Sequence, residues 1–355
     1  MNLKNKVMVR YGKSSEDFLP HKKSFFVENN RLLTKGVKIN KLYASQPKRN
    51  KCKNCNYILG EPKFKKLHVC YCFCERCGHL NGMSEDTADF CNSVYTDDRG
   101  VSYAELYSSK SIDSFNERTR DIYVPKAEFL KDALIYADVQ PATLRYADIG
   151  AGTGYFVAAM KKIGLVDSVG YEVSDQQIEV GNSMIGSSAL NKLEIDKTPE
   201  LIESLEADVI SMIGVLEHLQ HPRLVLSALK DNKKLKFFFI SVPLFSISVF
   251  FEMVFPNVFN RQLSGAHTHL YTETSLKYMA KEFNLELVAS WWFGTDMMDL
   301  HRSLSTSIRQ NSDISKMTSM WNDLFTPLLD NLQLQLDEKH FSSEVHMLYA
   351  VHGEK

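Results

Sequence analysis

The 355-residue sequence lacks features that would place it in several large classes of protein. It has no apolar stretch at its N-terminus, which argues against a secretory signal. It shows no internal repeat and no low-complexity tract. Its longest uncharged apolar run, residues 237–251, is shorter than the roughly 18–20 residues that cross a membrane, and Pro243 interrupts it. We therefore expect a cytoplasmic protein without a membrane span, leaving peripheral membrane contact open. Residues 237–251 are predicted to form a buried strand, an apolar loop and a helix.

The sequence also lacks a large net charge, but its charges are unevenly distributed. The net charge is −1, whereas residues 1–68 hold 17 Lys and Arg residues against 4 Asp and Glu. A basic segment attached to an acidic remainder indicates an anionic partner, or contact between the two parts. A solvated basic surface is the alternative.

The cysteines are grouped in one short region of the chain. Two Cys-x-x-Cys pairs are separated by 18 residues, and a glycine follows the second pair. In a reducing compartment such cysteines are metal ligands or core thiols rather than disulfides. The spacing is typical of a tetrahedral structural zinc site. We expect Zn²⁺ bound by Cys52, Cys55, Cys74 and Cys77. Cys70 or Cys72 could replace one of these ligands, and Cys91 is predicted to be a buried thiol.

From about residue 115 onward, strand-like and helix-like segments alternate, which predicts an α/β fold with a largely parallel sheet. We expect a basic segment (1–51), a ribbon-like zinc-binding domain (52–95), a connector (96–120) and a large domain (121–355), in which residues 244–275 form a lid. The predicted strands are 144–150, 167–173, 192–195, 207–214, 235–242, 285–293 and 345–352. The predicted helices are 155–164, 174–186, 221–231 and 272–283, with one long helix over 311–339.

A glycine cluster, "DIGAGTG" (148–154), lies between the first of these strands and its helix. Glycines let a ligand approach the backbone closely and permit positive φ. Asp148 in front of them would repel a pyrophosphate but suit an ammonium group. Glu172 ends the next strand, where an acid commonly binds ribose hydroxyls. The absence of a following Gly-Lys-Ser/Thr argues against a P-loop, and the spacing differs from the GxGxxG of NAD enzymes.

These residues, together with "VLEHLQHP" (215–222), resemble the S-adenosylmethionine (SAM) site of class I methyltransferases over roughly residues 120–355. The resemblance implies a Rossmann-like, seven-stranded methyltransferase fold with a small N-terminal zinc-binding domain. It implies that the methionine portion of SAM is held by the acid and the loop, the ribose by Glu172, and the cofactor's flank by the end of the fourth strand. The residues concerned are Asp148, Gly150, Ala151, Gly152, Gly154, Glu172, Ile213 and Gly214.

A narrower resemblance involves the zinc region and the text after it, "VSYAELYSSKSIDSF" (101–115). This order is similar to sugar C-methyltransferases that act on nucleotide-linked deoxysugars. It implies that the connector lies over the active site, which makes Tyr107 a candidate catalytic residue. Those enzymes carry a His-Glu-His-Leu stretch for proton handling, and here Thr268 occupies the glutamate position.

Because that carboxylate is missing, we expect O-methylation rather than C-methylation of a sugar in a nucleotide-linked or glycan (polysaccharide) precursor. His269 is the expected base and His267 the second choice, since a neutral imidazole can take a proton from a hydroxyl. A structural role at a helix entrance remains open for either histidine. Two other functions remain open: a zinc-ribbon RNA methyltransferase and a non-catalytic, methyltransferase-like interaction protein. RNA is less favoured, because the basic residues are not interleaved with stacking aromatics.

Overall fold

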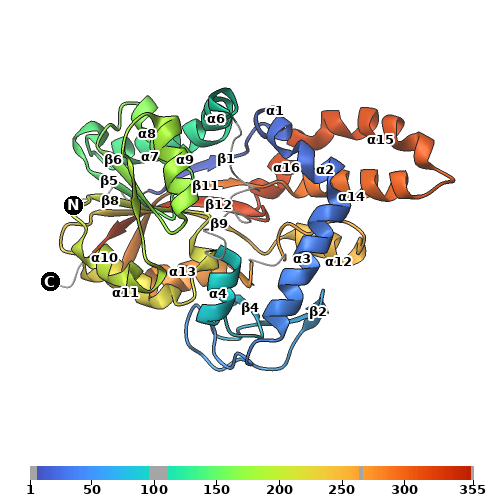
Figure 1. Cartoon of the computed structure of the whole chain (residues 1–355), viewed down its shortest axis with the longest axis horizontal. Helices are drawn as coiled ribbons and strands as arrows, with labels where there is room; N and C mark the ends of the chain where they lie inside the picture. Colours follow the sequence, from blue (N-terminus) through green and yellow to red (C-terminus); the bar gives the residue numbers. More distant parts are fainter. Residues whose placement is uncertain (1–5, 96–110, 264–266, 353–355) are drawn as a thin grey trace.

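The computed structural model describes residues 6–95, 111–263 and 267–352, and an eight-stranded sheet forms its centre (Figure 1). The strands β5 to β9 that carry the predicted alternation run parallel, β12 is antiparallel to both its neighbours, and β1 is parallel to β11. In spatial order the strands are β1 (Met8–Tyr11), β11 (Leu285–Phe293), β12 (Glu344–Val351), β9 (Phe237–Pro243), β8 (Val209–Ile213), β5 (Tyr146–Ile149), β6 (Ser168–Glu172) and β7 (Leu190–Lys192).

All seven predicted strands have a counterpart in the sheet, although β7 (Leu190–Lys192) shares only Lys192 with its predicted range, 192–195. The eighth strand, β1, was not predicted. It comes from the basic N-terminal segment and extends the sheet at its β11 edge. This segment is therefore part of the large sheet, not a separate appendage.

Helices cover both faces of the sheet and enclose two apolar clusters. Helices α10, α11 and α13 pack on one face, and α7, α8 and α9 on the other. Strand β9 lies between these layers, so most of its Phe237–Pro243 run is fully buried, as expected for a central strand. Ser174 caps α9 by accepting a hydrogen bond from the Gln177 N–H. The helices are α7 (Val124–Tyr136), α8 (Tyr155–Lys162), α9 (Asp175–Ile185), α10 (Thr198–Ser204), α11 (Pro222–Asp231) and α13 (Glu273–Glu282).

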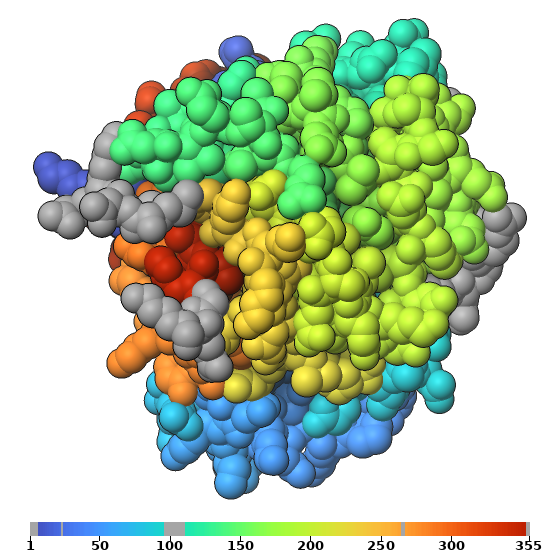
Figure 2. Space-filling model, turned by 90° about the vertical axis from the view of Figure 1, so that its left-hand side faces the viewer, coloured from blue at the N-terminus to red at the C-terminus, as the bar shows by residue number. Residues whose placement is uncertain are grey.

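The cysteine region forms a small second sheet below the large one, with helices α3 and α4 beside it (Figure 1). Figure 2 shows this region in blue and cyan as the lower part of the molecule, directly beneath the yellow and green residues of the large domain. The sheet has the order β10 (His269–Leu270), β4 (Leu80–Gly82), β3 (Val69–Phe73) and β2 (Phe64–Lys66). Its strand β10 comes from the predicted lid, so the two regions share a sheet. Helices α3 (Asn29–Ala44) and α4 (Ala88–Tyr95) flank it.

The remaining helices join these layers or project from them. The predicted single helix over 311–339 is wrong: the structure has a turn after Gln310, then two short helices that meet at a 3₁₀ turn containing Pro327. Proline lacks the N–H that a continuous helix needs at this point. Among the described residues, no helix is long and apolar enough to cross a membrane. The helices that join the layers or project from them are α1 (Ser15–Phe18), α2 (Lys23–Val27), α6 (Ile112–Arg118), α12 (Ile247–Val254), α14 (Asp296–Gln310), α15 (Thr318–Phe325) and α16 (Leu329–Asp337).

Candidate functional site

The glycine loop connects the carboxyl end of β5 to helix α8. Gly150 and Gly152 have φ angles of 70° and 56°, in the left-handed region that side chains disfavour. A Cβ atom on Gly150 would also lie 2.6 Å from Cγ2 of Val215, in the segment that follows β8. Position 150 therefore requires glycine both for its backbone conformation and for its close approach to the neighbouring loop.

Two acids lie near the ends of the adjacent strands β5 and β6, and both are almost fully buried. Burial raises the pKa of Asp148 to about 7, although Ser211 donates a 2.6 Å hydrogen bond to it. Burial also raises the pKa of Glu172, against the hydrogen bonds that its carboxylate accepts. One of these comes from the backbone N–H of Gly152 at 2.7 Å. Glu172 thus ties the glycine loop to the end of β6.

A cavity of about 920 Å³ opens over these residues, a volume in the usual range of small-molecule sites. It is bounded by the glycine loop, the ends of several sheet strands and parts of the N-terminal 95 residues. Gly154 does not line it, because that glycine packs against Ile185 and Leu190. The other predicted cofactor residues do: Asp148, Gly150, Ala151, Gly152, Glu172, Ile213 and Gly214.

Beyond the glycine loop, the cavity wall carries a group of one carboxylate and two imidazoles: Glu217, His218 and His267. The Glu217 side chain is 3% exposed, and burial raises its pKa to about 8. His267 hydrogen-bonds through Nδ1 to the backbone carbonyl of Gln262 at 3.0 Å, and burial lowers its pKa to about 4. His218 contacts the Tyr95 hydroxyl through Nδ1 at 3.0 Å. Glu217, His218 and Tyr95 were not predicted from the sequence to be functional. The motif "VLEH" (215–218) contains the first two and could have indicated them.

The cavity also contains a cluster of cations around Glu344: Lys13, Lys22, Arg118, Lys126 and Arg261. Burial acts to raise the pKa of Glu344, but the cations, Lys126 foremost, lower it to about 2. Lys126 lies 3.3 Å from Glu344, and Arg261 lies 3.0 Å from Asp299.

The other three cations of this cluster form no ion pair with any residue that the structure describes. Burial, and then the charges of Arg261 and Arg118, lower the pKa of Lys22 well below its usual value. Burial and Lys126 lower that of Lys13 to about 8. The part of the cavity around Glu344 therefore carries more basic than acidic side chains, although burial reduces the charge of the two lysines. The basic N-terminal segment supplies two of these residues, although the sequence did not show which.

His269, the base expected from the sequence, does not line this cavity. It belongs to β10, pairs opposite Asn81 of β4 and is fully buried. Its Nδ1 lies 2.8 Å from Nε2 of His79, just after the second cysteine pair. His267, two residues earlier, reaches the cavity instead. Tyr107 and the rest of the tyrosine-containing stretch at 101–110 lie outside the described residues.

Comparison with known proteins bears on this arrangement of sheet, loop and acids. Residues 120–290 match a family model described as a methyltransferase domain. The match confirms the predicted Rossmann-like methyltransferase fold and the enzyme class, and it supports dependence on SAM. No curated protein matches the chain.

Several solved structures similar to this chain are described as methyltransferases, at low sequence identity. Magnesium protoporphyrin IX methyltransferase from Synechocystis PCC 6803 is 8% identical, with 75% of this chain and 100% of that chain covered and a TM-score of 0.46. A protein described as a sarcosine dimethylglycine methyltransferase from Galdieria sulphuraria is 13% identical, with 72% and 98% covered and a TM-score of 0.45.

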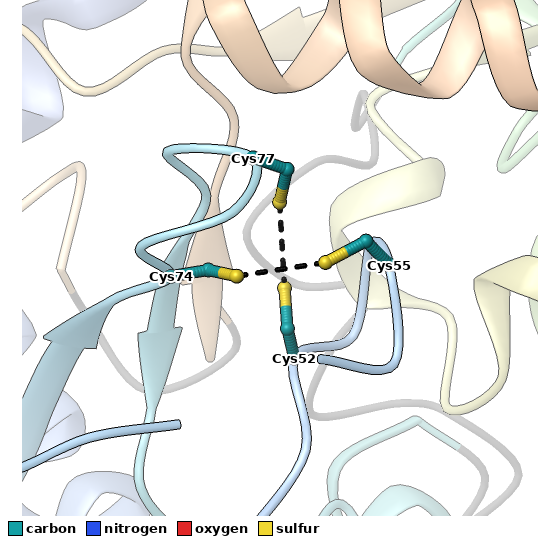
Figure 3. Close-up of side chains that lie close together, drawn as sticks. All are labelled: Cys52, Cys55, Cys74 and Cys77. Atoms are coloured by element: carbon teal, nitrogen blue, oxygen red, sulfur yellow. Dashed lines mark hydrogen bonds between the residues drawn. The ribbon is translucent and has the colours of Figure 1, made fainter. Parts of the chain in front are cut away.

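The methyltransferase domain is joined to a cluster of four buried cysteines, whose side chains converge on one point (Figure 3). Cys52 and Cys77 sulfurs lie 3.7 Å apart, and those of Cys55 and Cys74 lie 3.5 Å apart. Sulfurs at about 2.3 Å from a tetrahedral zinc ion are separated by about 3.8 Å, so this set fits that ion. Cys72 is not part of the cluster.

The cysteine cluster contacts the loop that carries Glu217 and His218. Lys53, between the first two cysteines, donates a 2.8 Å hydrogen bond to the Leu219 carbonyl. Arg223 of α11 donates one of 2.7 Å to the Asn54 carbonyl. The neighbouring Cys91 lines the cavity directly. The N-terminal region therefore forms part of the wall of the methyltransferase cavity.

Proposed function

We propose that this protein transfers a methyl group from SAM to a hydroxyl of a negatively charged small acceptor, with a nucleotide-linked or phosphorylated sugar as the acceptor class. The observation that carries the proposal is one cavity containing three elements. These are the glycine loop with its two acids, the Glu217–His218–His267 group, and an excess of cations around Glu344.

The cofactor end is assigned to the loop and the two acids. Asp148 would face the ammonium group of the methionine portion, which would favour the ionised carboxylate over the protonated form that burial promotes. Glu172 would accept ribose hydroxyls with the lone pairs that its backbone hydrogen bonds leave available. Ile213 and Gly214 would flank the cofactor. SAM supplies an activated methyl group, so the protein mainly aligns the acceptor with it.

The anionic acceptor is supported by the unpaired cations. Three cations lining the cavity lie over aromatic rings but form no ion pair with the described residues, and burying such charge without a counter-ion is unfavourable. A phosphate or diphosphate would supply the missing negative charge through charge-assisted hydrogen bonds. Since these side chains point into a cavity rather than over an open surface, a small acceptor fits better than RNA.

The preference for a hydroxyl acceptor now depends on different residues from those in the sequence argument. Thr268, whose identity suggested O-methylation, does not line the cavity. The Glu217–His218–His267 group does, and a hydroxyl needs only that its proton be accepted or its acidity raised as the methyl group transfers. The same requirement is more stringent for a carbon acceptor beside a ketone.

Turnover tests this function. Full-length protein with SAM would be incubated with nucleotide-linked sugars, sugar phosphates and matched uncharged sugars, with RNA as a separate arm. Products would be identified by mass spectrometry. We expect O-methylated products from the charged sugars and little from their uncharged counterparts. Methylation of RNA alone, or of carbon in the sugar, would contradict the proposal.

A further inference from the structure

The Glu217–His218–His267 group has the composition of a metal site. We propose that these three side chains bind a divalent metal ion, separate from the ion of the cysteine cluster, and that this ion binds the acceptor hydroxyl. The second half of this statement rests on the proposed function; the first half rests on the geometry of the three side chains.

The three residues offer ligand atoms at near-coordination distances. One ligand atom from each side chain lies within 4.8 Å of the other two, and the Glu217 Oε1 to His218 Nε2 distance is 3.9 Å. Bonds of about 2.1 Å from nitrogen or oxygen to a tetrahedral ion place two ligand atoms about 3.4 Å apart. The Glu217–His218 distance would therefore close by about 0.5 Å, and a pair at the 4.8 Å limit by about 1.4 Å, which requires side-chain rotation as the ion binds.

The ring of His267 is held in the tautomer that a metal ligand needs. A carbonyl oxygen can only accept, so the 3.0 Å contact with Gln262 places the proton on Nδ1. The Nε2 atom then has a lone pair available. Gln262 is itself fixed, because its backbone N–H donates a 2.6 Å hydrogen bond to buried Glu252. The 3.0 Å contact of His218 Nδ1 with the Tyr95 hydroxyl leaves the other ring nitrogen toward Glu217. Such supporting contacts are usual behind metal-bound histidines.

Glu217 provides a second, independent observation. Its side chain is 3% exposed and lines the cavity, yet Oε2 has no hydrogen-bond partner among the described residues. A buried polar oxygen without a partner is unfavourable, and buried carboxylates are paired or coordinate metals. A cation bound by the Glu217 carboxylate and the two imidazoles would supply the charge that this carboxylate lacks.

One carboxylate and two imidazoles leave open coordination positions and favour first-row transition ions over Mg²⁺. An acceptor hydroxyl in an open position becomes more acidic, because the ion stabilises the oxygen anion. The hydroxyl then gives its proton to water, its oxygen forms the bond to the methyl carbon, and the carbon–sulfur bond breaks with its electron pair remaining on sulfur. The products are the methyl ether and S-adenosylhomocysteine.

Binding is tested with Mn²⁺ alone as the probe, by following the electron paramagnetic resonance signal of free Mn²⁺ during titration of zinc-loaded, full-length protein. We expect one Mn²⁺ per chain, with Glu217→Gln and His267→Gln each weakening it by at least about 10-fold. His221→Gln is the matched control: His221 lines the same cavity but is not in the group, so its affinity should be unchanged. Tyr95→Phe keeps all three ligands but removes the hydroxyl that contacts His218 Nδ1, and we expect it to weaken Mn²⁺ binding as well. Unchanged Mn²⁺ affinity in Tyr95→Phe would contradict a supporting role of this contact.

Retained SAM binding would show that each variant is folded. Absence of Mn²⁺ binding to the wild type, or equal affinity in wild type and Glu217→Gln, would overturn the site. Turnover separates the two proposals. Methylation of a charged sugar that persists after this ion is removed leaves the proposed function intact and overturns the metal's role in it. A Mn²⁺ site that depends on Glu217, in a protein that methylates none of these sugars, supports the site and overturns the proposed acceptor.

Discussion

Replacing Gly150 by alanine tests whether the glycine loop is constrained by its backbone alone or also by its contact with the next loop. Gly150 has φ of 70°, and an added Cβ would lie 2.6 Å from Val215 Cγ2. Gly186, at the end of α9, has φ of 75°, but an added Cβ would meet no atom within 4 Å. Gly186→Ala is therefore a control with the same backbone penalty and no steric conflict.

The two effects have different magnitudes. A left-handed alanine costs about 1–2 kcal/mol, and this should be the whole effect of Gly186→Ala. Gly150→Ala should add about 1–3 kcal/mol of overpacking, for a total of about 2–5 kcal/mol. The added Cβ conflicts with the Val215 side chain, so combining Gly150→Ala with Val215→Ala should restore most of the stability that overpacking costs. The Val215 Cβ that remains would lie 3.5 Å from the added Cβ, an ordinary van der Waals distance.

Urea unfolding of the wild type, Gly150→Ala, Val215→Ala and the double variant would give the coupling between positions 150 and 215. Gly186→Ala would be measured beside them, and calorimetry would give SAM affinity. We expect Gly150→Ala to weaken SAM binding by more than 10-fold and Gly186→Ala to leave it unchanged, because only Gly150 lines the cavity. Equal destabilisation by the two alanines, or no coupling with Val215→Ala, would refute the steric part of this reasoning. Unchanged SAM affinity in Gly150→Ala would refute the cofactor assignment of the loop.

Three further predictions concern the acid, the cations and the cysteines. Burial raises the pKa of Asp148 from 3.8 to about 7, so its contribution to stability is present below pH 4 and is lost as the pH rises to about 7. Between pH 5 and pH 8, the free energy of urea unfolding should therefore fall less for Asp148→Asn than for the wild type. An equal fall in both would contradict the burial argument. Lys22→Gln should raise the KM for a phosphorylated sugar by about 10-fold or more and leave SAM affinity unchanged, since it removes one charge-assisted hydrogen bond of about 1.5–3 kcal/mol. An unchanged KM would exclude Lys22 from anion binding. Cys74→Ser should lower the zinc content well below one per chain. It should also speed hydrogen exchange at residues 216–222, because Lys53 and Arg223 connect the two regions there. Normal zinc content would contradict the ligand assignment.

The sequence predicted those parts of the fold that depend on local pattern. Strand β11 matches its predicted range, 285–293, because its apolar and aromatic residues form one run that only Glu286 and Ser290 interrupt. The glycine loop was recognisable for a similar reason, since its conformational demand is met by residues adjacent in the chain. The helix predicted over 311–339 failed because apolar periodicity continues across a turn and across Pro327, and periodicity does not report backbone breaks.

The candidate site was less predictable, because its chemistry is assembled from distant segments. Lys22, Tyr95, Glu217 and His267 meet in one cavity from four separate parts of the chain. His269 illustrates the difficulty. It differs from His267 by two positions, but a two-residue pairing with β4, some 190 residues away, places it in the core of the cysteine region. The sequence around the two histidines does not show which of them pairs with β4 and so lies outside the cavity.

That pairing also explains why the cysteine region and the methyltransferase domain act as one structure. Strand β10 completes the cysteine region's sheet, and the loop just before it carries His267 to the cavity. On the other side of the cavity, Lys53 holds the Leu219 carbonyl one residue after His218. The cysteine cluster thus fixes the chain next to both imidazoles of the proposed metal group. Its loss should alter the spacing of that group before it alters the glycine loop, since the loop is held by Glu172 within the large sheet.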